Sequence, residues 1–294
     1  RKQKDEKNKF LQNPIFICAF TLMLYLVCIP IMNLGDDKIG MIPMRAILGG
    51  SFALIMYMVA GKGFFRSKIN MNIFTIFATI MFLSISLCLL IFSYQESTKV
   101  IKSGWESEVF ISLILMLCVG IMEEFMCRAI FLNGFRKMFA KNKKGLYGAV
   151  LLSSLIFGVL HYSYYHLFLH MHNGDSVVAF LFVVLKILIT TGVGVFFATI
   201  YLKTNSILYC VILHGLNDFI LDICDIWIFL YRSSSVLANQ KQDLFQLIVK
   251  CILYVVAICT IIVYVVKTLP KINPEENIMW KSDDKDNEVL EAVS

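Results

Sequence analysis

Charged residues are scarce in this chain. Asp, Glu, Lys and Arg make up 16% of its 294 residues, whereas hydrophobic residues make up 58%. Because a soluble domain carries about 25% charged residues, this composition excludes an ordinary soluble fold. Eight apolar runs of about 20 residues, each long enough to cross a bilayer, predict instead a polytopic membrane protein. They cover residues 14–34, 43–61, 71–94, 109–132, 147–168, 177–201, 207–230 and 244–266.

Several short motifs are also missing. The nine cysteines include no CxxC pair and all lie in the apolar runs, which argues against a disulfide framework and a zinc knuckle. There is no HExxH sequence of the kind that binds zinc in many metalloproteases. The first apolar run lacks an A-x-A-like cleavage site, so we expect it to be retained as the first helix.

Lysine and arginine are distributed unevenly between alternate loops. In the eight-span topology, 18 of them fall on the side that holds both termini and 5 on the other side. The positive-inside rule therefore predicts a multi-pass protein of the cell membrane with both termini in the cytoplasm. This topology and the anionic lipid bilayer explain the net charge of +6, and we expect no nucleic-acid partner.

Two adjacent carboxylates and an arginine interrupt the fourth apolar run, in the sequence GIMEEFMCRAIF. Glu124 and Arg128 are four residues apart, so they share a helix face and suit an internal ion pair. Glu123 points about 100° away from that face and lacks this partner. Ionisable groups inside a membrane normally face a cavity or one another. The pattern predicts a structural role for Glu124 and a free carboxylate at Glu123.

Two other runs carry polar residues at the same helical spacing. The fifth run contains FGVLH and the seventh contains HGLND, and each places a histidine on a face with a second residue four positions away. These residues are Phe157 and His161, then His214 and Asp218, with Asp222 and Asp225 continuing the second face. If the three runs converge, a carboxylate in a poorly solvated cavity can activate water, while histidines assist and stabilise an oxyanion. That chemistry cleaves amides without a nucleophilic serine or cysteine.

The three motifs together resemble the CAAX protease and bacteriocin-processing family of intramembrane peptidases, which includes the Ras-converting enzyme. EExxxR, FxxxH and HxxxD occur in the order typical of that family, on separate predicted spans within residues 109–225. The eight apolar runs and the uneven distribution of lysine and arginine predict an all-α fold of about eight transmembrane helices, in which helices four to seven enclose a polar cavity. The resemblance implies that this cavity is catalytic. We expect four parts: residues 1–108 with a cytoplasmic segment and three spans, a catalytic core at 109–230, a last span at 231–266, and a cytoplasmic tail at 267–294.

The resemblance also implies roles for the residues of the first two motifs. Glu123 would activate the water, Glu124 would pair with Arg128, and His161 would assist the water. The substrate would be a membrane-associated peptide or protein, hydrolysed near its terminus. Prenylated tails, bacteriocin leaders and secreted signalling peptides are the classes that the resemblance allows.

The third motif departs from the pattern of some family members. His214 and residue 218 would support the oxyanion or a metal, and an asparagine at position 218 could donate a hydrogen bond that the ionised Asp218 cannot. His161, His214 and Asp218 offer two nitrogens and a carboxylate, a set that could hold a divalent metal such as zinc. The sequence leaves the cofactor open.

Two other classes of function remain open at this stage. Intramembrane acids also form ion paths, and the stripe from His214 to Asp225 suits an ion-coupled transporter. A non-catalytic immunity or scaffold protein could keep the same fold for binding. Loss of proteolysis in a Glu123→Ala variant would separate the endopeptidase from both alternatives.

Overall fold

The computed structural model describes residues 12–32, 38–66, 69–96, 105–161, 176–232, 240–276 and 278–280, and these residues form helices and no strand. Each of the eight predicted apolar runs contains a helix in the described residues, which confirms an all-α polytopic protein. The elements are α2 (Pro14–Met32), α3 (Lys38–Ala60), η1 (Lys62–Arg66), α4 (Ile73–Glu96), α5 (Trp105–Glu124), η2 (Phe125–Leu132), α6 (Asn133–Phe139), α7 (Lys143–Leu160), α9 (Ser176–Thr204), α10 (Ile207–Arg232), α11 (Gln240–Thr268) and η3 (Leu269–Lys271).

Six helices in the described part of the chain are long and apolar enough to cross a membrane. The other two long helices are α4, which is also apolar, and α10, which carries a polar stripe. Two helix ends differ from the sequence prediction. The fourth run extends from Trp105 through Phe139 instead of ending at residue 132, and α7 ends at Leu160, with His161 as its cap, instead of continuing to residue 168. The six spans are 14–32, 38–60, 106–139, 143–160, 183–204 and 251–271.

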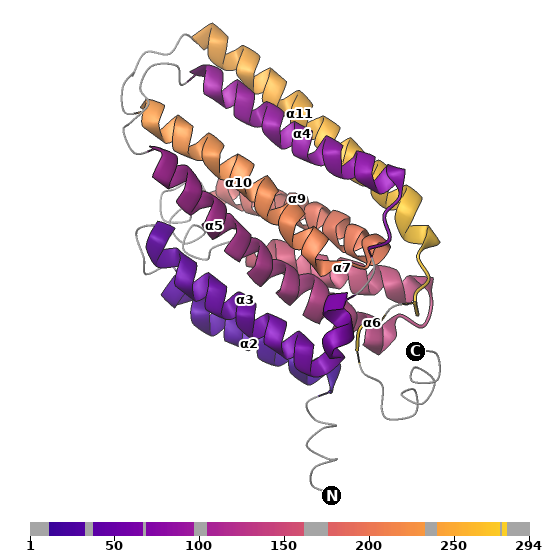
Figure 1. Cartoon of the computed structure of the whole chain (residues 1–294). Coiled ribbons are helices and arrows are strands. Elements are labelled where there is room, and N and C mark those ends of the chain that lie inside the picture. The colour runs from indigo at the N-terminus through magenta and orange to yellow at the C-terminus, as the bar shows by residue number, and fades with distance from the viewer. Residues whose placement is uncertain are drawn as a thin grey trace, which may run out of the picture.

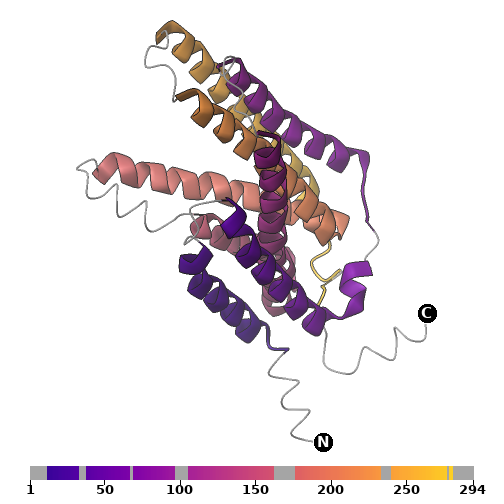
Figure 2. The same cartoon turned by 60° about the vertical axis from the view of Figure 1, so that its left-hand side comes forward.

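The helices pack side by side, with α5 between α3 and α10, and with α4 between α10 and α11 (Figure 1). Behind this row α7 packs against α9, whose first turns project from the bundle (Figure 2). The outer faces are apolar: Ile73 is 85% exposed and Val266 is 65% exposed. Such surfaces aggregate in water but suit the hydrocarbon of a bilayer.

The segment α5–η2–α6 is one continuous rod through the centre of the bundle. All residues from Glu124 to Arg136 are buried. The middle part, η2, is a π-helix, a geometry that is rare and is frequently found at functional sites. At its end the Asn133 side chain donates to the carbonyl oxygens of Arg128 and Ala129, at 3.2 and 3.0 Å, and contacts the Tyr201 hydroxyl at 2.8 Å. Asn133 thus satisfies carbonyls where the helical hydrogen-bonding pattern changes.

The chain after α11 lies across the end of the bundle where α2 begins. Arg136 of α6 donates to the carbonyl oxygens of Pro274 and Glu276, and Lys143 of α7 donates to that of Pro270 at 2.7 Å. Trp280 Nε1 donates to the carbonyl oxygen of Gln12 at 2.8 Å. Both ends of the described chain therefore lie at the same end of the bundle.

Candidate active site

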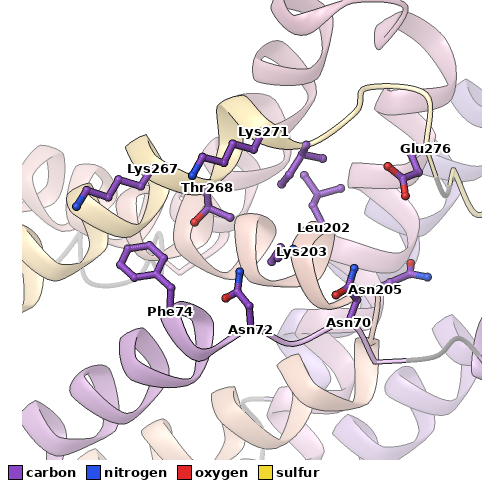
Figure 3. A pocket seen from close by; sticks show the side chains of 11 residues that line it. Asn70, Asn72, Phe74, Leu202, Lys203, Asn205, Lys267, Thr268, Lys271 and Glu276 are labelled. Atoms are coloured by element: carbon purple, nitrogen blue, oxygen red, sulfur yellow. The ribbon is translucent and has the colours of Figure 1, made fainter.

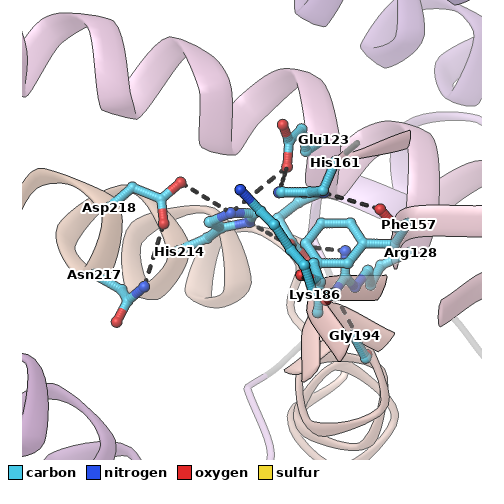
Figure 4. Close-up of polar contacts among 11 residues, drawn as sticks. Glu123, Arg128, Phe157, His161, Lys186, Gly194, His214, Asn217 and Asp218 are labelled. Carbon is cyan, nitrogen blue, oxygen red and sulfur yellow. Dashed lines mark hydrogen bonds and ion pairs between the residues drawn. The ribbon is translucent and has the colours of Figure 1, made fainter. Parts of the chain in front are cut away.

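Four helical segments bring the sequence-predicted polar residues together. Glu123 and Glu124 end α5, and Arg128 lies in η2 directly after them. His161 caps α7, and His214 and Asp218 lie one helical turn apart on α10. Figure 4 shows these side chains converging, so the juxtaposition predicted from the three motifs is present.

Close contact between α5 and α10 makes this convergence possible. A Cβ atom at Gly120 would lie 2.9 Å from the carbonyl oxygen of Val211, and one at Gly215 would lie 3.0 Å from a Leu117 methyl group. Real Cβ atoms do not approach a backbone oxygen that closely, so only glycine at position 120 permits this separation. Since Gly120 and Gly215 neighbour the glutamates and His214 in sequence, the contact brings these groups within reach of one another.

Glu124 is fully buried and engaged on two sides. Its Oε1 lies 3.1 Å from Arg128 Nη1 and accepts a hydrogen bond from His214 Nδ1 at 2.7 Å. The first contact is the ion pair expected from the four-residue spacing. The second, to a residue 90 positions later, was not expected from the sequence.

Arg128 is 1% exposed and is enclosed by aromatic rings. Its guanidinium carbon lies 4.3 Å from the ring centroid of Phe157 and 5.3 Å from that of Phe197, and Nη2 donates to the Gly194 carbonyl at 3.4 Å. These contacts compensate in part for burying the cation. Phe157, the first residue of FxxxH, is therefore a wall of the site, and Phe197 is a second wall that the sequence analysis missed.

Glu123 differs from its neighbour because the described residues form no hydrogen bond with its Oε2, whereas Oε1 of Glu124 accepts one from His214. Its side chain is 12% exposed, and Oε2 lies 3.4 Å from His161 Nε2 and 3.7 Å from His214 Nε2. Both distances are longer than a good hydrogen bond, and Oε2 is among the buried atoms without such a bond in the described residues. Glu123 is thus a carboxylate that faces two imidazoles and is bonded to neither.

The second ring nitrogen of each imidazole, Nδ1, already forms a hydrogen bond. His161 Nδ1 lies 2.9 Å from the Phe157 carbonyl, which can only accept, so Nδ1 carries the proton. By the same reasoning His214 Nδ1 carries a proton toward Glu124. In neutral His161 the Nε2 atom that faces Glu123 is therefore a hydrogen-bond acceptor.

Two residues outside the predicted site, Asn217 and Ser86, help to position Asp218. Its Oδ2 lies 3.2 Å from His214 Nε2, and its Oδ1 accepts from Asn217 Nδ2 at 3.2 Å. Asn217 in turn accepts from the Ser86 hydroxyl of α4 at 2.7 Å. Asn217 stands next to Asp218 in HGLND and could have been noticed, whereas nothing local signals Ser86, which is 131 residues away.

The acidic stripe does not continue as a row of free carboxylates. Asp222 contacts Lys38 of α3 and accepts a hydrogen bond from Ser112 of α5. The side chain of Asp225 lies outside the described residues, as do His166, His170 and His172 of the following loop. Asp222 therefore joins α10 to two neighbouring helices.

A metal is implied by part of the resemblance, and the donor types fit zinc. Metal-binding histidines normally donate their second N–H to a carbonyl or carboxylate, as His161 and His214 do. Yet across the described ranges no group of three or more His, Cys, Asp or Glu side chains has the arrangement of a metal site. A metal held by His161, His214 and Asp218 stays a prediction from the sequence.

Comparison with known proteins gives a match to a protein family. Residues 105–220 match the family model described as type II CAAX prenyl endopeptidase Rce1-like. This range contains all three motifs and ends two residues after Asp218. No curated protein and no solved structure matches the chain significantly.

Proposed function

We propose that the protein is an intramembrane endopeptidase that uses water activated by Glu123, in keeping with the match of residues 105–220 to the Rce1-like family model. The observation that carries this proposal is the contrast between the two glutamates. Glu124 is bonded to Arg128 and His214, while Glu123 faces His161 and His214 without a hydrogen bond.

A water molecule completes this arrangement. An oxygen atom about 2.8 Å from both Glu123 Oε2 and His161 Nε2 can donate one hydrogen to each, because both atoms are acceptors. Its lone pair then faces away from them, toward an incoming carbonyl carbon. Glu123 takes the proton as the water oxygen bonds to that carbon.

His214 is the group that we propose to stabilise the oxyanion. Its Nδ1 lies 2.7 Å from Glu124 Oε1, and its Nε2 lies 3.2 Å from Asp218 Oδ2 and 3.7 Å from Glu123 Oε2. His214 thus lies between Glu124 and Asp218, and in its imidazolium form both ring nitrogens donate. Its Nε2–H then stabilises the negative charge that develops on the carbonyl oxygen.

The proposed reaction is completed without a covalent bond between enzyme and substrate. When the tetrahedral species collapses, the C–N bond breaks and Glu123 returns its proton to the departing amine. The products are a new carboxylic acid, which passes its proton to the new amino group, and Glu123 is again ionised. Glu124 and Arg128 take no part in the proton transfer, and Glu124 holds His214 in place.

We propose a membrane-associated peptide or protein as substrate. The reacting groups lie on membrane helices among buried residues, so the substrate must reach them within or at the edge of the bilayer. Prenylated tails, peptide leaders and secreted peptides all meet this requirement.

Comparative peptidomics tests the function directly. A deletion strain is complemented with the wild-type chain or with Glu123→Gln, which preserves size and removes the base. We expect at least one membrane-associated peptide to be cleaved only with the wild type, with a rate loss of at least about 100-fold in the variant.

The same strains separate the alternatives. Lost ion flux without any change in the peptides would indicate a transporter, and full function of Glu123→Gln would indicate a scaffold. Either result would contradict the endopeptidase proposal.

A further inference from the structure

A basic cavity of about 500 Å³ lies at the end of the bundle where the described chain begins and ends, apart from the candidate active site (Figure 3). The start of α4 and the ends of α9 and α11 form it. Lys203, Lys267 and Lys271 line it together with the amides of Asn70 and Asn72 and the carboxylate of Glu276. The lining thus has three cations and one anion.

These lysines are available to a ligand. Within the described ranges none of the three forms an ion pair with a carboxylate, and Lys267 and Lys271 are exposed. Lysines near helix C-termini also complement the helix dipole, and that alone would explain Lys203 and Lys267. It does not explain why they share a cavity with asparagine amides, which are hydrogen-bond donors.

An apolar groove of about 290 Å³ begins where this cavity ends. It runs between α4 and α11 and is lined by Phe77, Val256, Cys259 and Val263, among others. Phe74 lines both spaces, and its ring lies 5.9 Å from Lys267 Nζ. From Phe74 the groove follows α4 and α11 away from the helix ends, toward the middle of the membrane-spanning segments.

We propose that the cavity and the groove together bind one anionic phospholipid. The lysine ammonium groups and asparagine amides would hold the phosphate, and an acyl chain would occupy the groove. Basic pockets between membrane helices on the cytoplasmic side are suited to anionic headgroups. A soluble phosphate would use the cavity and leave the groove empty, so the continuity through Phe74 favours a lipid.

The walls of the site are fixed before any lipid binds. The Asn70 N–H donates to the Thr204 carbonyl at 2.9 Å, and Asn72 Oδ1 accepts from the Thr75 N–H at 2.8 Å. The Thr75 and Tyr264 hydroxyls lie 3.1 Å apart and join α4 to α11. Little ordering is therefore needed on binding.

Native mass spectrometry of the full chain, purified from nanodiscs of equal parts phosphatidylglycerol and phosphatidylcholine, tests the cationic half. We expect the wild type to retain phosphatidylglycerol preferentially. Lys203→Gln, Lys267→Gln and Lys271→Gln combined should reduce that retention at least about tenfold, since each basic residue near a membrane surface contributes measurably to anionic lipid affinity. The matched control replaces Lys62, Lys137 and Lys141, which are exposed and lie outside the cavity, and should retain the lipid.

A second pair of variants tests the apolar groove. Cys259→Trp fills the groove and should also reduce retention, whereas Cys251→Trp, an exposed position on α11 outside the groove, should not. Thermal unfolding of each variant in detergent confirms that it is folded. Equal loss in both lysine triples would show a general charge effect, and displacement of the lipid by millimolar glycerol phosphate, with no effect of Cys259→Trp, would show a soluble-anion site. Either result overturns the proposal.

Discussion

Glu123 and Glu124 are neighbours in the chain with opposite surroundings. Their side chains leave the helix about 100° apart, so one reaches Arg128 and His214 and the other faces the two Nε2 atoms. This division between a structural and a free carboxylate could be predicted from the sequence, because it follows from helical spacing alone. The hydrogen bond from His214 to Glu124 could not, because it depends on how α10 packs against α5.

Replacing each of these glutamates with glutamine should therefore affect stability differently. Glu124→Gln leaves the buried Arg128 cation without its counter-ion and should lower the free energy of unfolding by about 3–5 kcal/mol. Glu123→Gln should change it by less than about 1 kcal/mol. Thermal unfolding of the purified protein in detergent measures both. Equal destabilisation would show that Glu123 is also structural.

Asp218→Asn tests how residue 218 acts. We propose that Asp218 stabilises the protonated form of His214, and an amide lacks the required charge. The variant should therefore lose about 10–100-fold in cleavage rate at unchanged stability. A rate at or above that of the wild type would show that residue 218 acts as an oxyanion donor, because asparagine always carries one. Ser86→Ala, which removes only the support of Asn217, should have a smaller effect in the same direction.

At the scale of helices, the apolar runs located each long helix, to within a few residues at most ends, because span length and hydropathy are local properties. The π-helix η2 could not be predicted in this way. Its sequence, FMCRAIFL, contains neither proline nor glycine, and the Asn133 contacts that accompany it involve Tyr201, 68 residues away. The π-helix therefore occurs together with tertiary contacts, and the helix propensity of its own residues does not indicate it.

Gly120→Ala should disrupt the contact between α5 and α10. The new Cβ would meet the Val211 carbonyl at 2.9 Å, and a backbone atom cannot move aside as a flexible side chain can. We expect a loss of about 1–3 kcal/mol in stability and a larger proportional loss of activity, because His214 moves away from Glu123. Gly192→Ala is the control, since a Cβ there meets nothing within 4 Å. A fully active Gly120→Ala variant would contradict this account of the site.

Asn133→Leu should destabilise the end of η2. The substitution preserves volume but leaves the carbonyl oxygens of Arg128 and Ala129 without their donor in a buried position. The expected cost is about 1–3 kcal/mol for each unsatisfied group, measured by thermal unfolding. If stability and cleavage are both unchanged, the π-helix does not depend on this side chain.

Across the whole molecule, the uneven distribution of lysine and arginine predicted a topology with both termini on one side, and the described ends do meet there through Gln12 and Trp280. Which face of the membrane this is remains our prediction of the cytoplasmic side. The basic cavity could not be predicted, because Lys203 and Lys267 belong to helices that are far apart in sequence.

Labelling with a membrane-impermeant maleimide tests this topology. Single cysteines introduced at Lys62 and Lys141, in a background without the natural cysteines, should react only after the membrane is opened. A cysteine at Glu106, in the first turn of α5 and on the predicted outer side of the membrane, should react in intact cells. Reaction of positions 62 and 141 from opposite sides would rule out the topology.

The contacts of Arg136 also bear on the order in which the protein is completed during synthesis. Its two carbonyl acceptors lie 138 and 140 residues later in the chain, beyond the last membrane helix. When the rod that carries both glutamates leaves the ribosome, these acceptors have not yet been made. The end of that rod can therefore close only after translation of almost the whole chain, so a nascent protein already inserted in the membrane still lacks part of the scaffold around its glutamates.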